Sequence, residues 1–119
     1  MRFVSLLLLL AGFTTNTLAE TVPFACNMNA MNKEERQRYG ALVLKMRKAQ
    51  IAQKELANGL EFSIDPKRFS LVELAEWITY ESKCCPFLTF GVTVDGGNVR
   101  LALTGEKGVK EFLKAELAE

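Results

Sequence analysis

Two adjacent cysteines, Cys84 and Cys85, followed directly by Pro86, constrain this chain more than any other feature of its sequence. Proline fixes its own φ angle and disfavours helical backbone in the residue before it, so a helix leading into the pair must end there. Neighbouring side chains on extended backbone point to opposite faces. We therefore expect a junction between a helix and a strand at this pair, with one cysteine facing inward and the other facing the surface.

The first 19 residues have the pattern of a secretory signal peptide. Met1-Arg2 supplies a positive charge, residues 3–13 are almost purely apolar, and Thr17-Leu18-Ala19 ends the segment with small residues at the −3 and −1 positions. The apolar stretch is too short to span a bilayer. We expect cleavage after Ala19, a periplasmic or secreted protein in which disulfides persist, and no transmembrane segment in the mature chain.

The charge of the mature chain narrows the choice of partner. Loss of residues 1–19 removes Arg2 and leaves 14 basic and 14 acidic residues. A neutral chain lacks the basic face typical of nucleic-acid-binding proteins and the polybasic segment that anionic membranes attract. We therefore expect no nucleic-acid partner, and we consider a metal ion or a protein instead.

Residues 20–31 show no periodicity and predict an irregular N-terminal arm, whereas residues 32–119 predict one small α+β domain with one core. Asn32 and Glu35 have the spacing of a capping box, and apolar residues then recur at helical spacing. This pattern predicts a helix of about seven turns that ends at Asn58-Gly59.

The remaining elements follow from capping and alternation. Ser70 with Glu73 predicts the start of a second helix, which runs to about residue 83, and a last helix follows Gly105. Alternating apolar residues predict three strands, at 60–64, 90–94 and 99–103. The expected order is helix, strand, helix, strand, strand, helix, with a three-stranded, largely antiparallel sheet covered by helices. The position of the first strand in the sheet stays open.

A disulfide is the simplest use of the cysteines. Cys26 could pair with Cys84 or Cys85 and tie the arm to the junction. Closing a loop of about 59 residues would stabilise the fold by roughly 4 kcal/mol. One thiol would then remain unpaired, which is unusual for a purely structural arrangement.

A soft-metal or metalloid site is the interpretation that uses all three cysteines, Cys26, Cys84 and Cys85. Thiolates and thioethers are the ligands that Cu(I) and other thiophilic ions prefer, and the chain contains no histidine for a typical zinc site. Further donors could be Met28, Met31 and Glu81. The alternative role of the two methionines is packing of the arm, and that of the glutamate is a solvated charge at the helix end.

An enzyme is less well supported. The chain has no Cys-x-x-Cys pair, no histidine base and no cysteine at the start of a helix, which are the usual means of lowering a thiol pKa. Cys84 instead follows a helix C-terminus, where the dipole disfavours a thiolate. A non-enzymatic protein is favoured, and a thiol redox protein is the third interpretation. We expect Trp77, Tyr80 and Phe87 to shelter the cysteines rather than to bind a ligand.

Two segments carry a resemblance to other proteins. The stretches Glu81–Phe87 and Leu101–Leu113 resemble a group of small bacterial proteins of unassigned function, which share an E-x-x-C-C-P-F segment and an L-x-L-T-G-x-x-G-V-K-x-F-L segment. The resemblance implies one compact domain built around the cysteines, and it implies no activity or cofactor. Thiol chemistry and export therefore favour an exported protein that binds a soft metal or metalloid. The alternative is a disulfide-stapled interaction or structural domain.

Overall fold

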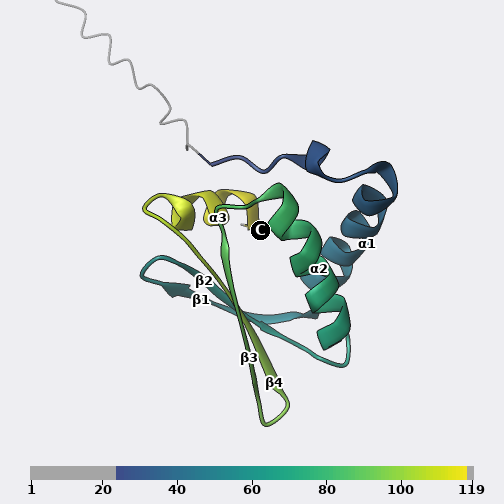
Figure 1. Ribbon diagram of the computed structural model, residues 1–119. Helices are drawn as coiled ribbons and strands as arrows, with labels where there is room; N and C mark the ends of the chain where they lie inside the picture. Colours follow the sequence, from purple (N-terminus) through teal and green to yellow (C-terminus); the bar gives the residue numbers. More distant parts are fainter. Residues whose placement is uncertain (1–23, 118–119) are drawn as a thin grey trace, which may run out of the picture.

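The computed structural model describes residues 24–117, and the expected signal peptide with its cleavage site lies outside them (Figure 1). The chain forms the expected small α+β domain. None of the helices in the described range is long and apolar enough to cross a membrane. The elements are the 3-10 turn η1 (Met28–Ala30), α1 (Lys33–Ala49), β1 (Gln50–Leu56), β2 (Gly59–Ile64), α2 (Leu71–Cys84), β3 (Thr89–Asp95), β4 (Asn98–Thr104) and α3 (Val109–Leu117).

The sheet has four antiparallel strands in the order β1-β2-β4-β3, so the expected three-stranded sheet is wrong by one strand. The predicted strand at 60–64 corresponds to β2, which lies between β1 and β4. In that pairing Phe62 faces Leu101 and Leu60 faces Leu103. The hairpin expected around residues 95–98 joins β3 and β4.

The additional strand, β1, occupies residues that the periodicity assigned to the first helix. α1 ends at Ala49, and β1 follows without a loop. A longer helix would need apolar residues at 50 and 53 to continue its inward face, and both are glutamine. As a strand, the same segment pairs with the outer edge of β2 and satisfies its backbone groups. Asn58-Gly59 is therefore part of a hairpin between β1 and β2, and it is not a helix end.

The core lies between one face of the sheet and the three helices, which gather on that side (Figure 1). Alternate residues of β2 and β4 point into it, as the period of two requires. The arm contributes as well, because Met31 is buried in the same cluster and Phe24 and Cys26 pack against it. The buried strand residues are Leu60, Phe62, Ile64, Val99, Leu101 and Leu103.

α1 and α2 lie side by side, and both begin with the capping box that the sequence predicts. The capping acids also cross the interface between the helices, because Glu35 pairs with Lys83 and Glu73 pairs with Lys45, each at 2.5 Å. These ion pairs are largely exposed, so each contributes little to stability. They flank the contact between α1 and α2, and the C-terminal end of α2 carries the cysteine pair.

Gly59 provides a test of the sheet. A Cβ at this position would overlap the carbonyl oxygen of Leu103 and lie 2.8 Å from the Cα of Thr104 on β4. We expect Gly59→Ala to lower the free energy of unfolding by about 2 kcal/mol or more, because the clash is with backbone that cannot move without breaking the β2–β4 pairing. Urea denaturation measures the change.

Gly40 is the matched control for this substitution. It lies within α1, and a Cβ there would meet nothing within 4 Å. Gly40→Ala should stabilise the protein by about 0.5–1 kcal/mol, because alanine is the better helix former. Equal effects of the two glycine substitutions would show that β2 and β4 do not approach as closely as described.

Candidate thiol site

The cysteine pair lies at the end of α2, where the backbone turns toward β3. Cys84 is the last residue of α2 and Cys85 is its C-cap, whose N–H donates to the carbonyl of Glu81 at 2.7 Å. The N-terminal arm crosses this point, because the N–H of Asn27 donates to the carbonyl of Cys84 at 2.8 Å. The helix end and the arm therefore form one backbone-bonded junction.

Aromatic side chains hold the arm in place. The ring of Phe24 lies 4.9 Å from that of Phe87, which in turn contacts Phe112 of α3 at 5.3 Å. Trp77 is buried on α2 and packs edge-on against Phe90 at 6.0 Å, and Tyr80 is partly buried against the core. Phe87 thus lies where the arm docks beside the cysteines, and Trp77 belongs to the core beneath them.

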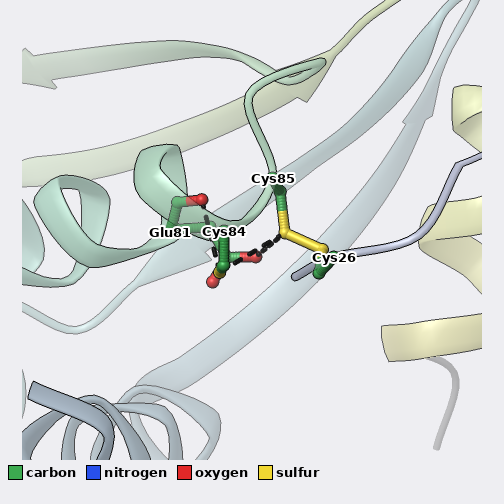
Figure 2. A group of neighbouring side chains, drawn as sticks. All are labelled: Cys26, Glu81, Cys84 and Cys85. Atoms are coloured by element: carbon green, nitrogen blue, oxygen red, sulfur yellow. Dashed lines mark hydrogen bonds between the residues drawn. A yellow bond between two sulfur atoms is a disulfide. The ribbon is translucent and has the colours of Figure 1, made fainter. Parts of the chain in front are cut away.

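Cys26 and Cys85 form a disulfide, with their Cα atoms 4.6 Å apart across 59 residues of sequence (Figure 2). The expectation that Cys26 lies beside the adjacent pair is confirmed, and Cys85 is the partner. Cys84 is the free thiol. Both members of the pair are fully buried, so the expectation that one faces the surface is wrong. The arm is the reason, because it covers the side of the turn on which Cys85 would otherwise be exposed.

Glu81 is buried, with 8% of its surface exposed, so the alternative of a solvated helix-end charge is wrong. Its Oε2 accepts a hydrogen bond of 2.5 Å from the hydroxyl of Tyr39, and its Oε1 lies 3.2 Å from the Sγ of Cys85. Burial raises the pKa of the Glu81 carboxyl, and the hydrogen bond from Tyr39 partly opposes this. The pKa of Tyr39 is raised by its own burial and by the charge of Glu81.

The candidate ligand atoms of Cys26, Glu81, Cys84 and Cys85 all lie within 4.8 Å of one another. Figure 2 shows them converging from the arm and from the last turn of α2. Of the two methionines, Met28 is 41% exposed and lines a neighbouring cavity together with Cys26 and Glu81, and Met31 is buried in the core cluster that contains Cys84 and Cys85. The compact group therefore consists of three sulfur atoms and one carboxylate.

Cys84 is held next to the disulfide in a form that resists exchange with it. Its Sγ lies 3.7 Å from that of Cys85. Burial, followed by the charge of Glu81, raises the pKa of the Cys84 thiol to about 11. In-line attack on Cys85 would also place this sulfur about 5.7 Å from the Sγ of Cys26, whereas the two lie within 4.8 Å. A free thiol and a disulfide can therefore coexist at this distance.

This environment predicts slow labelling of Cys84. At pH 7.5 fewer than about one molecule in a thousand carries the thiolate, so alkylation of the folded protein should be at least about 100-fold slower than after denaturation. Intact mass should show no added label in the folded protein, one after denaturation and three after denaturation with reduction. Ser82→Cys, at an exposed position of α2, is the control that must label quickly. Rapid labelling of the folded wild type would contradict the burial of Cys84.

The raised pKa of Glu81 predicts a pH dependence of stability. The unfolded chain loses this proton near pH 4.3, and the folded protein keeps it to higher pH, so stability falls as the pH rises through that window. Glu81→Gln removes this fall. From about pH 4 to pH 8 the variant should therefore gain stability relative to wild type. Urea denaturation at each pH measures the difference.

Glu76→Gln is the control for this pH dependence. Glu76 lies on the same helix, and its ion pair with Arg38 lowers its pKa. The ionised Glu76 stabilises the fold above its unfolded pKa, and this contribution is lost at low pH. Glu76→Gln should therefore lose stability relative to wild type as the pH rises, whereas Glu81→Gln gains it. Parallel profiles for Glu81→Gln and wild type would show that the Glu81 carboxyl does not titrate abnormally.

A cavity of about 430 Å³ opens beside the site, bounded by the arm, α1, α2 and α3. Cys26 and Glu81 form part of its wall. Two residues of the site, Tyr39 and Phe24, were not among those that the sequence predicted. Tyr39 had a usable signal, since it lies on the inward face of the first helix, and a buried tyrosine hydroxyl needs a polar partner.

Comparison of the chain with protein-family models, with curated proteins and with solved structures found no match. The function is therefore inferred from the geometry and chemistry of the site itself.

Proposed function

We propose that this chain is an exported thiol protein that binds a soft metal or metalloid ion through Cys26, Cys84 and Cys85 after its disulfide is reduced. The observation that carries the proposal is the convergence of these three sulfur atoms and the Glu81 carboxylate within 4.8 Å. Two segments far apart in the sequence supply them, so the arrangement is a product of the fold.

The donor set suits ions such as Cu(I), Hg(II) and As(III). Three thiolates are soft ligands, which these ions prefer over oxygen and nitrogen. Each thiol loses its proton on binding, and the positive charge of the ion compensates the burial that otherwise disfavours the thiolate of Cys84. Glu81 stands beside the sulfur atoms as a carboxylate that Tyr39 orients. It would serve as an additional oxygen ligand or as the nearest acceptor of a released proton.

Reduction of the Cys26–Cys85 bond is a condition of this function, because two of the three ligands are joined in the disulfide. The reduced protein loses its covalent link between the arm and the α2 end. An ion that bridges Cys26 to either partner would restore that link. Metal binding and disulfide formation would thus stabilise the same junction in the two redox states.

The alternative function is that of a disulfide-stapled interaction or structural domain. The disulfide itself supports it, because the bond joins the arm to the core and exported small domains often depend on such links. A thiol redox protein is third, since the burial and raised pKa of Cys84 oppose its action as a nucleophile.

The test is ion binding by the purified protein in its two redox states. Protein reduced with a trialkylphosphine is titrated with arsenite, Hg(II) and Cu(I), and the melting temperature and bound metal per chain are measured. We expect one ion per chain and an unfolding free energy raised by about 2.7 kcal/mol at a free concentration 100 times the Kd. The oxidised protein should show no comparable shift.

Variants of the site residues identify the ligands. Cys84→Ser and Cys85→Ser should each weaken affinity at least about tenfold, since each removes a thiolate. Glu81→Gln tests the buried carboxylate, and Glu76→Gln, which removes a partly exposed carboxylate on the same helix, is its control. Met28→Leu tests the thioether: affinity should stay unchanged if the exposed Met28 only lines the cavity, and it should fall if its sulfur is a further ligand. If none of the three ions shifts the melting of the reduced protein, the stapled-domain alternative replaces the proposal.

A further inference from the structure

The cavity beside the thiol site is much larger than a bare ion requires. Its volume is about 430 Å³, whereas one water molecule occupies about 30 Å³ of liquid and an engineered cavity of about 150 Å³ holds benzene. A metal ion bound between the sulfur atoms would leave most of this space to water. The cavity therefore accommodates something beyond the ion.

The lining of the cavity is mainly apolar. Val43 and Met46 of α1, Trp77 of α2 and Phe112 and Leu113 of α3 contribute side chains to it. Its more polar members include Arg47 and Glu116, which are both exposed. The apolar part of this space favours an apolar group, because water beside those side chains has few hydrogen-bond partners. The buried Nε1 of Trp77, which finds no acceptor among residues 24–117, illustrates how few polar partners this region offers.

The thiol site and the cavity share a wall. Cys26 and Glu81 belong to both, whereas Cys84 and Cys85 lie fully buried behind them. A ligand bound to Cys26 and to one cysteine of the pair would therefore lie at the cavity wall, with room for a substituent inside the cavity. The cavity therefore has the sulfur atoms of the thiol site at one side and mainly apolar side chains along its other walls.

Resting on the proposed thiol function, we infer that the preferred ligand is an organic derivative of a thiophilic element, with an aryl or larger alkyl group that fills the cavity. Trivalent organoarsenic compounds are suitable probes. In R–As(OH)₂ the two As–O bonds and two cysteine S–H bonds break, two As–S bonds form and two water molecules leave. Arsenic stays trivalent. The disulfide is first reduced by a trialkylphosphine, which becomes the phosphine oxide with oxygen from water and yields two thiols.

The experiment compares phenylarsenic(III) with methylarsenic(III), which both bind two thiols and differ only in the apolar group. The ratio of their affinities for the reduced protein is measured against the same ratio for a small dithiol in solution. We expect the protein to prefer the phenyl compound at least about tenfold more than the dithiol does, because the ring is removed from water. If the phenyl-to-methyl affinity ratio is the same for the protein and for the dithiol, the inference is overturned.

A variant that fills the cavity supplies the second measurement. Ala115→Trp places an indole at an exposed position of α3 that lines the cavity, and Ala41→Trp places one at an exposed helical position that does not line it. Ala115→Trp should abolish the phenyl preference and leave arsenite affinity unchanged, and Ala41→Trp should alter neither. Circular dichroism checks that both variants fold. A phenyl preference that survives Ala115→Trp also overturns the inference.

Arsenite separates the two proposals. If arsenite and methylarsenic bind but the phenyl compound gains nothing, the cavity inference fails and the thiol function stands. If no arsenic compound binds the reduced protein, both fail together.

Discussion

Cys26→Ser is expected to lower the free energy of unfolding by about 4 kcal/mol relative to the oxidised wild type. The Cys26–Cys85 bond closes a loop across 59 residues of sequence, and removing the crosslink restores the loop entropy of the unfolded chain. For a domain of this size the loss is a large share of the total, since small domains are stable by about 5–15 kcal/mol. Guanidinium denaturation of the two proteins without reductant measures it.

Two comparisons show whether the crosslink is the cause. Reduced wild type should match Cys26→Ser within about 1 kcal/mol, because both lack the bond. Cys84→Ala leaves the disulfide intact and removes only a small buried thiol, so it should cost about 1 kcal/mol. If Cys26→Ser were no less stable than the oxidised wild type, the disulfide would not contribute to folding stability.

Trp77→Ala is expected to cost about 3–5 kcal/mol, which lowers the melting temperature by more than about 10 °C. Trp77 lies on α2 and is 2% exposed. Its ring packs against Phe90 of β3 and lines the cavity. Truncation removes most of its contacts and enlarges the space beside the thiol site. Thermal unfolding followed by circular dichroism measures the shift.

Trp77→Phe separates packing from hydrogen bonding. Phenylalanine keeps an aromatic ring and removes the Nε1–H, which is buried without a partner in the described part of the chain. Because an unpaired buried donor is itself unfavourable, we expect this variant to cost at most about half as much as Trp77→Ala. A melting temperature unchanged by Trp77→Ala, together with lost ion binding, would assign the side chain to ligand binding instead.

Local patterns predicted the helix starts correctly. Asn32 with Glu35 and Ser70 with Glu73 begin α1 and α2, because each pair satisfies backbone N–H groups within a few residues and needs no distant partner. Pro86 likewise ends α2 at the cysteine pair. The β3–β4 hairpin follows from its turn residues, which adopt the required conformations through Gly96 and Gly97, both with positive φ.

The main error of the sequence prediction was to assign residues 50–56 to the first helix, and long-range strand pairing explains it. Residues 50–56 contain several good helix formers. Most of their side chains are exposed, so no apolar alternation marks the segment as a strand. Their conformation is decided by the open edge of β2, which accepts them as a strand. The two glutamines at 50 and 53 signal that the helix stops, but they do not indicate a strand.

Residue type and short spacing predicted the starts of α1 and α2 and the end of α2 at the cysteine pair, because each of these depends only on neighbouring residues. The same local patterns carry the hypotheses of an exported chain and of a site at the three cysteines. Three further features follow only from the folded arrangement: Cys85 pairs with Cys26, Cys84 stays buried and free, and Glu81 with Tyr39 lies beside them. The docking of the arm onto the end of α2 brings Cys26 to Cys85, and the packing of α1 against α2 brings Tyr39 to Glu81. That docking depends on packing among Phe24, Phe87 and Phe112, which lie far apart in the chain and interact only once the domain has folded.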